Sequence, residues 1–294
     1  MNNNHGRDRL AAYATGNAPP ARQESAAPMW PRLLGTLGVA FACSVCVLFI
    51  TLPLLALLMR VPLDSLWGYL GSPLVAGALR LSAISSLSSL LLMVLLGTPL
   101  AYMMARFNFR GKAVLETIVE VPLVLPPAVA GLALLLAFGR RSPLGGLLQG
   151  LNMEIAFTLA AVVLAQTFVA APFYIKAARV AFQGVPRDLM EVARTYGAGN
   201  FQVFRHIVLP LALPGIAGGA VMGWSRAVGE FGATILFAGN FQDRTQTMPL
   251  AIYSAFESDL NAAIVLAAIL VIISFSVLLS FKLLSGRSLD VMPD

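Results

Sequence analysis

Charged residues are scarce in this chain of 294 residues, since Asp, Glu, Lys and Arg together make up only 12% of it. A typical soluble domain carries about 25%. Apolar residues reach 58%, and the mean hydropathy is +0.79. We therefore do not expect a water-soluble fold, because so few charges cannot shield that much apolar surface from water.

Cysteine and histidine are also scarce, with two of each. Cys43 and Cys46 lie in an apolar stretch, and His5 and His206 are too far apart in the sequence for a zinc site or a His-based triad. The phosphate-binding pattern G-x-x-x-x-G-K-[ST] and the G-x-S-x-G nucleophile pattern are both missing. We expect no catalytic site, no metal and no cofactor bound by this chain.

Long apolar runs, in contrast, are abundant. A bilayer core about 30 Å thick needs about 20 mostly apolar residues in a helix. Runs such as Leu90–Leu96 lack the alternation of a barrel strand, so the sequence predicts an all-α, polytopic membrane protein. The six predicted spans are Leu33–Met59, Leu79–Ala105, Ile118–Phe138, Ala156–Ala178, Leu211–Leu236 and Ala262–Phe281.

Lys and Arg concentrate in alternate connections between these spans. They gather in residues 1–32, 106–112 and 176–205 and after the last span. Short loops rich in Lys and Arg stay on the cytoplasmic side, so both termini are predicted to be cytoplasmic, in a bacterial inner membrane. The net charge of +6 follows from this bias and from contact with anionic lipids, and nucleic acid is not an expected partner.

The two ends of the chain differ from its middle. Residues 1–30 are rich in Asn, Ala, Pro and Arg and lack the features of a signal peptide, so they predict a disordered cytoplasmic tail. Residues 31–285 form the predicted transmembrane domain. Residues 286–294 would be a short cytoplasmic tail, and we expect no C-terminal regulatory domain.

The predicted cytoplasmic loop at about 184–210 contains a short amphipathic helix. Its apolar residues follow the i, i+3, i+4, i+7 spacing of one helix face, and Gly197 suits the left-handed position that ends a helix. Such a stripe needs cover from a partner protein or from the membrane interface. The apolar stripe is Leu189, Val192, Ala193 and Tyr196, and Asp188, Glu191, Arg194 and Thr195 occupy the other faces.

The spacing in this loop resembles the EAA loop of ATP-binding-cassette (ABC) importer permeases, with Val in place of the first Ala. The resemblance implies a type I importer permease fold and docking of the loop in a groove of a separate ATPase subunit, which would hold ATP and Mg²⁺. Glu191 would hydrogen-bond or ion-pair there, Ala193 would permit close approach and Gly197 would let the chain turn. The implied coupling residues are Leu189, Glu191, Val192, Ala193, Tyr196, Gly197, Ile207, Leu209 and Pro210.

Further segments are similar to molybdate permeases, with tungstate and sulfate/thiosulfate permeases as close relatives. The double proline Pro126-Pro127 and the run Phe237–Asn240 favour molybdate within this group. The resemblance implies alternating access, a second permease copy and an extracytoplasmic binding protein that carries the affinity for the oxyanion. It covers roughly Leu79 to Phe281 and is carried by Val121–Pro127, Gly139–Gly145, Leu209–Gly215 and Arg226–Thr234.

Arg226 and Glu230 are charges inside the fifth predicted span, four residues apart on one helix face, where they can pair. The pair either holds this span in the bundle or belongs to a pathway or gate for an oxyanion, and the sequence leaves both roles open. Prolines should kink or break the third span. The residues predicted for the pathway or gate are Arg226, Gly229, Glu230, Phe231, Gly232, Thr234, Pro126 and Pro127.

Two functions of other classes compete with an importer subunit. An ion-coupled secondary transporter would need carboxylates inside the membrane, and Glu230 is the only clear candidate in the sequence. A membrane enzyme lacks a plausible set of catalytic residues. Within the importer class, sulfate is the second choice of substrate.

Overall fold

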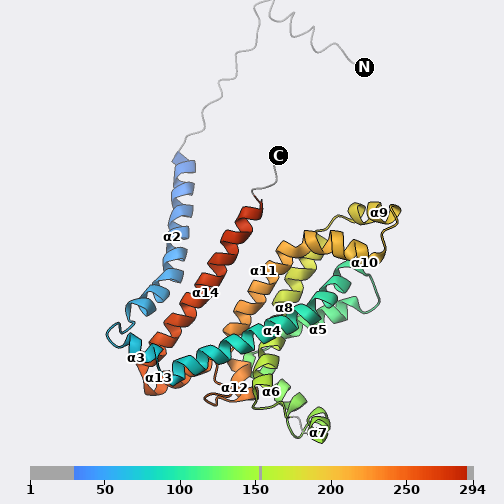
Figure 1. The fold of residues 1–294 in the computed structure, drawn as a ribbon. Helices are drawn as coiled ribbons and strands as arrows, with labels where there is room; N and C mark the ends of the chain where they lie inside the picture. Colours follow the sequence, from blue (N-terminus) through green and yellow to red (C-terminus); the bar gives the residue numbers. More distant parts are fainter. Residues whose placement is uncertain (1–29, 152–153, 290–294) are drawn as a thin grey trace, which may run out of the picture. The chain divides into compact units, whose positions relative to one another are not determined.

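The computed structural model describes residues 30–151 and 154–289, and all regular structure in that part of the chain is helical, which confirms the all-α prediction. Contacts between Cα atoms divide the chain into two units, Met1–Pro53 and Leu54–Asp294, which are described separately. The helices (Figure 1) are α2 (Trp30–Met59), α3 (Leu66–Leu70), α4 (Pro73–Arg106), α5 (Lys112–Val124), α6 (Pro127–Phe138), α7 (Pro143–Gly150), α8 (Leu159–Gln183), α9 (Arg187–Thr195), α10 (Asn200–Val203), the π-turn η1 (Phe204–Val208), α11 (Leu209–Val228), α12 (Gly232–Ala238), α13 (Met248–Ser258) and α14 (Leu260–Leu289).

In the first unit, the described residues form α2 up to Pro53. Polar side chains within this apolar helix form hydrogen bonds to backbone carbonyls of the preceding turn. Ser44 donates its hydroxyl to the carbonyl of Ala40, and Thr51 donates to that of Val47, both at 2.8 Å. This matters in a membrane, where an unpaired polar group costs several kcal/mol.

In the second unit, α4, α8 and α11 pack together into a central bundle (Figure 1). Glycines at the contacts allow a close approach of the helix backbones, as small residues do in membrane bundles. A Cβ placed on Gly219 would lie 2.8 Å from the Cβ of Ala177, and one on Gly97 would lie 2.8 Å from the Tyr174 ring. The core of this bundle includes the fully buried side chains of Met93 and Tyr174.

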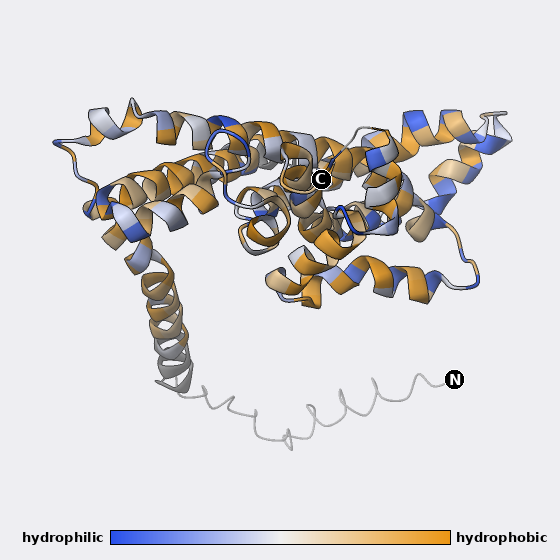
Figure 2. Ribbon diagram, turned by 90° about the horizontal axis from the view of Figure 1, so that it is seen from below, coloured by the Kyte–Doolittle hydropathy of each residue, from blue (hydrophilic) through white to orange (hydrophobic). Residues whose placement is uncertain are grey.

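The described residues contain five helices that are long and apolar enough to cross a membrane, and a sixth candidate span is the pair α5 and α6, bent by 117°. The prolines therefore break the third predicted span. The break falls at Leu125 and Pro126, while Pro122 lies inside α5 without ending it. Figure 2 shows apolar residues over most of the long helices and hydrophilic ones gathered mainly in the connections.

The fifth predicted span, Leu211–Leu236, is wrong as a single helix. The helix α11 ends at Val228, and α12 begins at Gly232. Glycine is a poor helix former, and Gly229 and Gly232 flank the break. The side chain of Glu230 accepts a hydrogen bond from the backbone N–H of Ala233, which satisfies an amide that the first turn of α12 would leave unpaired.

The predicted N-terminal tail, residues 1–30, lies outside the described residues except for Trp30, which begins α2. At the other end, α14 continues to Leu289, so the first residues of the predicted C-terminal tail are helical, and 290–294 lie outside the described part. Within the second unit, α9 lies at the end opposite α12 and α13, and α14 runs from α13 toward the α9 end (Figure 1).

Candidate functional site

The amphipathic helix expected in the cytoplasmic loop is present as α9, with Pro186 at its N-cap. Its C-terminus has the hydrogen bonds of a Schellman motif. The N–H of Gly197 donates to the carbonyl of Arg194 at 2.9 Å, and the N–H of Ala198 donates to that of Ala193 at 3.1 Å. Gly197 has φ of +86°, which confirms the left-handed position predicted from the sequence.

The outer face of α9 consists of Leu189, Glu191, Val192 and Tyr196, all of them exposed. The exposed fractions of its three apolar side chains are 46% for Leu189, 54% for Val192 and 88% for Tyr196. A helix that leaves such a face uncovered at the end of a bundle is a candidate docking surface.

The inner face of α9 holds it to the rest of the molecule. Met190 is 7% exposed and belongs to the main core, and Ala193 packs against that core. Ala193 lies one helical turn after Leu189 and forms the partly buried edge of the predicted apolar stripe, next to Met190, while Leu189 and Val192 stay exposed. Met190, which the pattern did not single out, is the buried anchor.

Aromatic and polar contacts join the segments next to α9 to the central bundle. The Tyr102 ring lies against Phe182 and Phe204, with centroid distances of 5.3 Å and 4.9 Å. Arg106, at the end of α4, donates a hydrogen bond to the carbonyl of Val185 at 3.1 Å. These contacts join the segments just before and after α9 to α4, α8 and η1.

The remaining predicted coupling residues lie in the continuous helical segment that follows α9. Ile207 is half-buried in η1, where the backbone makes one π-helical turn, and Leu209 and Pro210 begin α11. Single π-turns inside helices are common at functional sites. This turn lies where the loop enters the bundle.

The predicted pathway residues come together where two helix breaks meet. One break separates α5 from α6, and the other separates α11 from α12. A Cβ on Gly232 would lie 2.6 Å from the Cβ of Pro127, and a Cβ on Gly131 would lie 2.7 Å from the carbonyl oxygen of Ala233. The two glycines thus allow α6 and α12 to come into close contact. The two helix breaks therefore lie next to each other.

Arg226 and Glu230 form an ion pair at this place. The Arg226 Nη1 atom lies 2.7 Å from Glu230 Oε2, and the side chains are 30% and 1% exposed. Glu230 Oε1 accepts the N–H of Ala233 at 2.8 Å. The carboxylate therefore ties the end of α11 to the start of α12, with both oxygens in use, rather than pairing along one continuous helix.

The other predicted pathway residues have varied surroundings. Phe231 packs against Tyr253 of α13, with ring centroids 5.2 Å apart. Thr234 is fully buried, and its hydroxyl has no hydrogen-bond partner within the described part of the chain. Gly229 and Pro126 are exposed. The structure thus gathers these residues around the breaks but buries only some of them.

Two further ion pairs were not predicted from the sequence, where Glu230 was the only carboxylate singled out within the predicted spans. Glu116 and Glu120 of α5 pair with Arg179 and Lys176 of α8, each at 2.9 Å. The sequence spacing could have indicated these pairs. The two acids are four residues apart and the two bases three, so the acids share one face of their helix and the bases share one face of theirs.

The comparisons with known proteins agree on one family. Residues 97–288 match the family model described as "Binding-protein-dependent transport system inner membrane component". A molybdenum transport system permease protein, ModB of Mycobacterium bovis, is 41% identical over 252 residues, covering 86% of this chain and 92% of the relative. The ModB protein of Escherichia coli K12 is 42% identical over 54% of this chain and 69% of the relative.

Solved structures show the same fold. A bacterial ABC transporter involved in the import of the acidic polysaccharide alginate matches with a TM-score of 0.70 over 88% of this chain and 97% of that chain, at 17% identity. The MetNI methionine ABC transporter matches with a TM-score of 0.52 over 78% of this chain and 97% of that chain, at 20% identity. The type I importer permease fold implied by the loop is thereby confirmed.

Proposed function

Because this chain belongs to the family of binding-protein-dependent transport system inner membrane components, we propose that it is the permease subunit of an ATP-driven importer for molybdate. The observation that carries the choice of substrate is the 41% identity to a molybdenum transport permease over 86% of the chain. The fold and the family establish a membrane transport component. Molybdate is the tetrahedral oxyanion that the named relatives indicate.

The outer face of α9 is the proposed docking site for an ATPase subunit. Its three exposed apolar residues would be covered by the partner's groove, and the exposed carboxylate of Glu191 would hydrogen-bond or ion-pair at the rim. Met190 and Ala193, packed on the core, would transmit the motion of the ATPase into the bundle. ATP and Mg²⁺ would be held by that partner and not by this chain.

The rest of the assembly follows from the same proposal. A second copy of the permease would complete the pore, and an extracytoplasmic binding protein would deliver the oxyanion to the end opposite α9. The α9 end would then face the cytoplasm, where the distribution of Lys and Arg also predicts both termini. The two helix breaks would then lie along or beside the pathway, where irregular backbone is tolerated because protein or a water-filled cavity covers it.

An ion-coupled transporter, the competing function, receives less support from the geometry. Such a protein needs carboxylates that exchange a proton or a cation during transport. Glu116 and Glu120 of α5, and Glu230 between α11 and α12, each have a basic partner within 2.9 Å. All three are thus used in ion pairs that hold helices together.

The test is transport by the purified permease in liposomes, together with its ATPase and binding protein. Molybdate, tungstate and sulfate would be added in competition, and uptake and ATP hydrolysis would be followed. We expect molybdate to drive ATP-dependent uptake at the lowest concentration. Stimulation by sulfate at a far lower concentration than by molybdate would contradict the choice of substrate, and uptake without ATP would contradict the importer itself.

A further inference from the structure

A polar cleft lies at the end of the second unit opposite α9. It has a volume of about 490 Å³ and is bounded by the first turns of α4, the start of α8 and the connection between α12 and α13. Two arginines, one from α4 and one from that connection, line it. The lining residues are Gly77, Arg80, Leu81, Ile84, Thr158, Leu159, Asp243 and Arg244.

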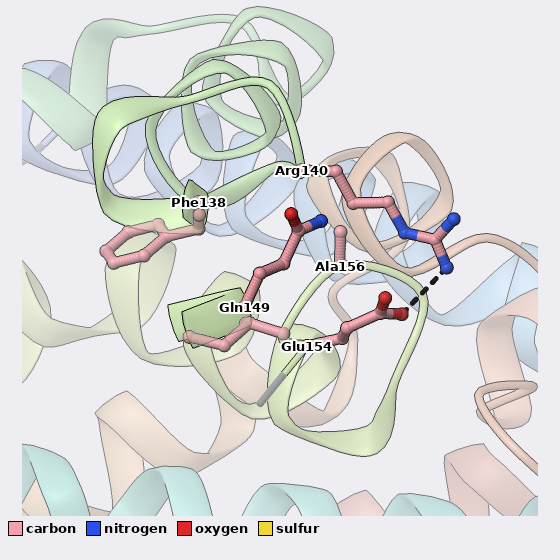
Figure 3. Close-up of a pocket in the computed structure, with 7 residues that line it drawn as sticks. Phe138, Arg140, Gln149, Glu154 and Ala156 are labelled. Carbon is pink, nitrogen blue, oxygen red and sulfur yellow. Dashed lines mark hydrogen bonds and ion pairs between the residues drawn. The ribbon is translucent and has the colours of Figure 1, made fainter. Parts of the chain in front are cut away.

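The arginines of this cleft form no ion pair within the described part of the chain, because no carboxylate lies within 4.0 Å of Arg80 or Arg244. Arg140, from the connection between α6 and α7, is a contrast. It pairs with Glu154 at 2.7 Å beside a pocket of only about 10 Å³ (Figure 3). The cleft at Arg80 therefore has both the room and the free positive charge that the Arg140 pocket lacks.

The backbone at Arg244 is held in a compact turn. The backbone N–H groups of Arg244, Thr245 and Gln246 all donate to the carbonyl of Phe241, at 3.1, 2.9 and 3.0 Å, and the Phe241 N–H donates to the Thr245 hydroxyl at 3.1 Å. The Phe241 ring packs edge-on against Phe157. These bonds order the backbone that carries the exposed Arg244 side chain, so less backbone freedom is lost when a ligand binds there.

Asp243 in the same turn lowers the net positive charge of the cleft. Its backbone is left-handed, with φ of 62°, and its carboxylate reaches α4, where a Cβ on Gly77 would lie 2.7 Å from Oδ1. The charged side chains of the cleft thus sum to one positive charge. Such a site attracts a divalent oxyanion without holding it tightly.

We propose that Arg80 and Arg244 form a receiving site for the tetrahedral oxyanion at the outer mouth of the permease, between the binding protein and the pathway. This inference rests on the proposed function. A guanidinium presents a fork of N–H donors that suits oxyanions, and Asp243 opposes the bound charge and promotes release inward. The cleft thus acts as a relay for the oxyanion, while the binding protein supplies the affinity.

The experiment uses the permease with its ATPase in nanodiscs or liposomes and ⁹⁹Mo-labelled molybdate as the probe. Binding is measured by equilibrium dialysis without the binding protein, and uptake is measured with it at subsaturating substrate. We expect R80Q, R244Q and the double variant to lose roughly tenfold in each measurement, as befits charge-assisted hydrogen bonds. The matched control is R140Q, which removes an arginine that already has a partner and should leave both measurements unchanged.

A variant that should increase binding provides a second test. D243N keeps a residue that tolerates the left-handed backbone but removes the opposing charge, so it should increase molybdate binding several-fold. Co-purification of the binding protein is followed in every variant. Retained docking with lost uptake supports the relay, whereas lost docking would assign the arginines to a protein interface and overturn it.

Two results separate this inference from the proposed function. If the wild-type complex imports molybdate and the double variant binds and imports it equally well, the relay is wrong and the proposed function stands. If the wild-type complex imports no oxyanion, the proposed function fails, and the relay fails with it.

Discussion

The ion pair between Arg226 and Glu230 gives a prediction whose size follows from its burial. Glu230 is 1% exposed and Arg226 is 30% exposed. Arg226→Ala would therefore leave a buried carboxylate with only the Ala233 N–H as a partner. Breaking a buried pair from one side costs about 3–5 kcal/mol, and the remaining hydrogen bond places the expected loss of unfolding free energy near the low end, at about 3 kcal/mol.

The double variant Arg226→Ala/Glu230→Gln should be more stable than Arg226→Ala alone, by about 1–2 kcal/mol. The glutamine carries no charge, and its amide oxygen can still accept the N–H of Ala233. A purely steric role of Arg226 would give no such recovery, because the second substitution restores none of the lost packing.

The assay is equilibrium unfolding in mixed micelles of lipid and detergent, with Arg140→Ala as the control. The Arg140–Glu154 pair has the same 2.7 Å separation, but its side chains are 69% and 47% exposed. Exposed pairs contribute about 0–1 kcal/mol, so the control should lose less than 1 kcal/mol. A double variant no more stable than Arg226→Ala, or a control as damaging as Arg226→Ala, would refute the burial argument.

Three further substitutions test helix contacts and backbone conformation in the second unit. Gly232→Ala should cost about 1–3 kcal/mol of unfolding free energy, because the new Cβ would meet the proline that opens α6, whereas Gly146→Ala in α7 has open space and should change stability little. Gly197→Ala should cost roughly 1–2 kcal/mol through the left-handed backbone and should weaken binding of the ATPase in a pull-down assay. Trp224→Phe removes the indole N–H that donates to the Ser86 hydroxyl at 3.2 Å, and a double-mutant cycle with Ser86→Ala should give a coupling of about 0.5–1.5 kcal/mol; a coupling near zero would show that this bond adds nothing.

The sequence was sufficient where structure depends on local rules. The start of α9 after Pro186 and the left-handed Gly197 follow from capping preferences that act within a few residues. The apolar runs likewise located the long apolar helices, because the bilayer thickness fixes their length, although the third and fifth predicted spans are broken. The loop spacing pointed to the family to which the chain proved to belong.

The features that the sequence did not reveal depend on contacts between distant segments. The break between α11 and α12 is stabilised where Gly232 meets Pro127, more than a hundred residues away in the chain. Helical periodicity did not single out Met190, which is buried against a core formed by residues of α4, α8 and α11. A single sequence read by local pattern carries little information about such contacts.

The most direct test of the central claim is ATP-dependent molybdate uptake by the Glu191→Ala permease, in liposomes with its ATPase and binding protein. The control is Glu257→Ala, which removes an exposed carboxylate from α13 at the opposite end of the bundle. If the outer face of α9 couples the ATPase to transport, the folded Glu191→Ala protein loses uptake and the control keeps it. Full ATP-dependent uptake by Glu191→Ala would contradict the account.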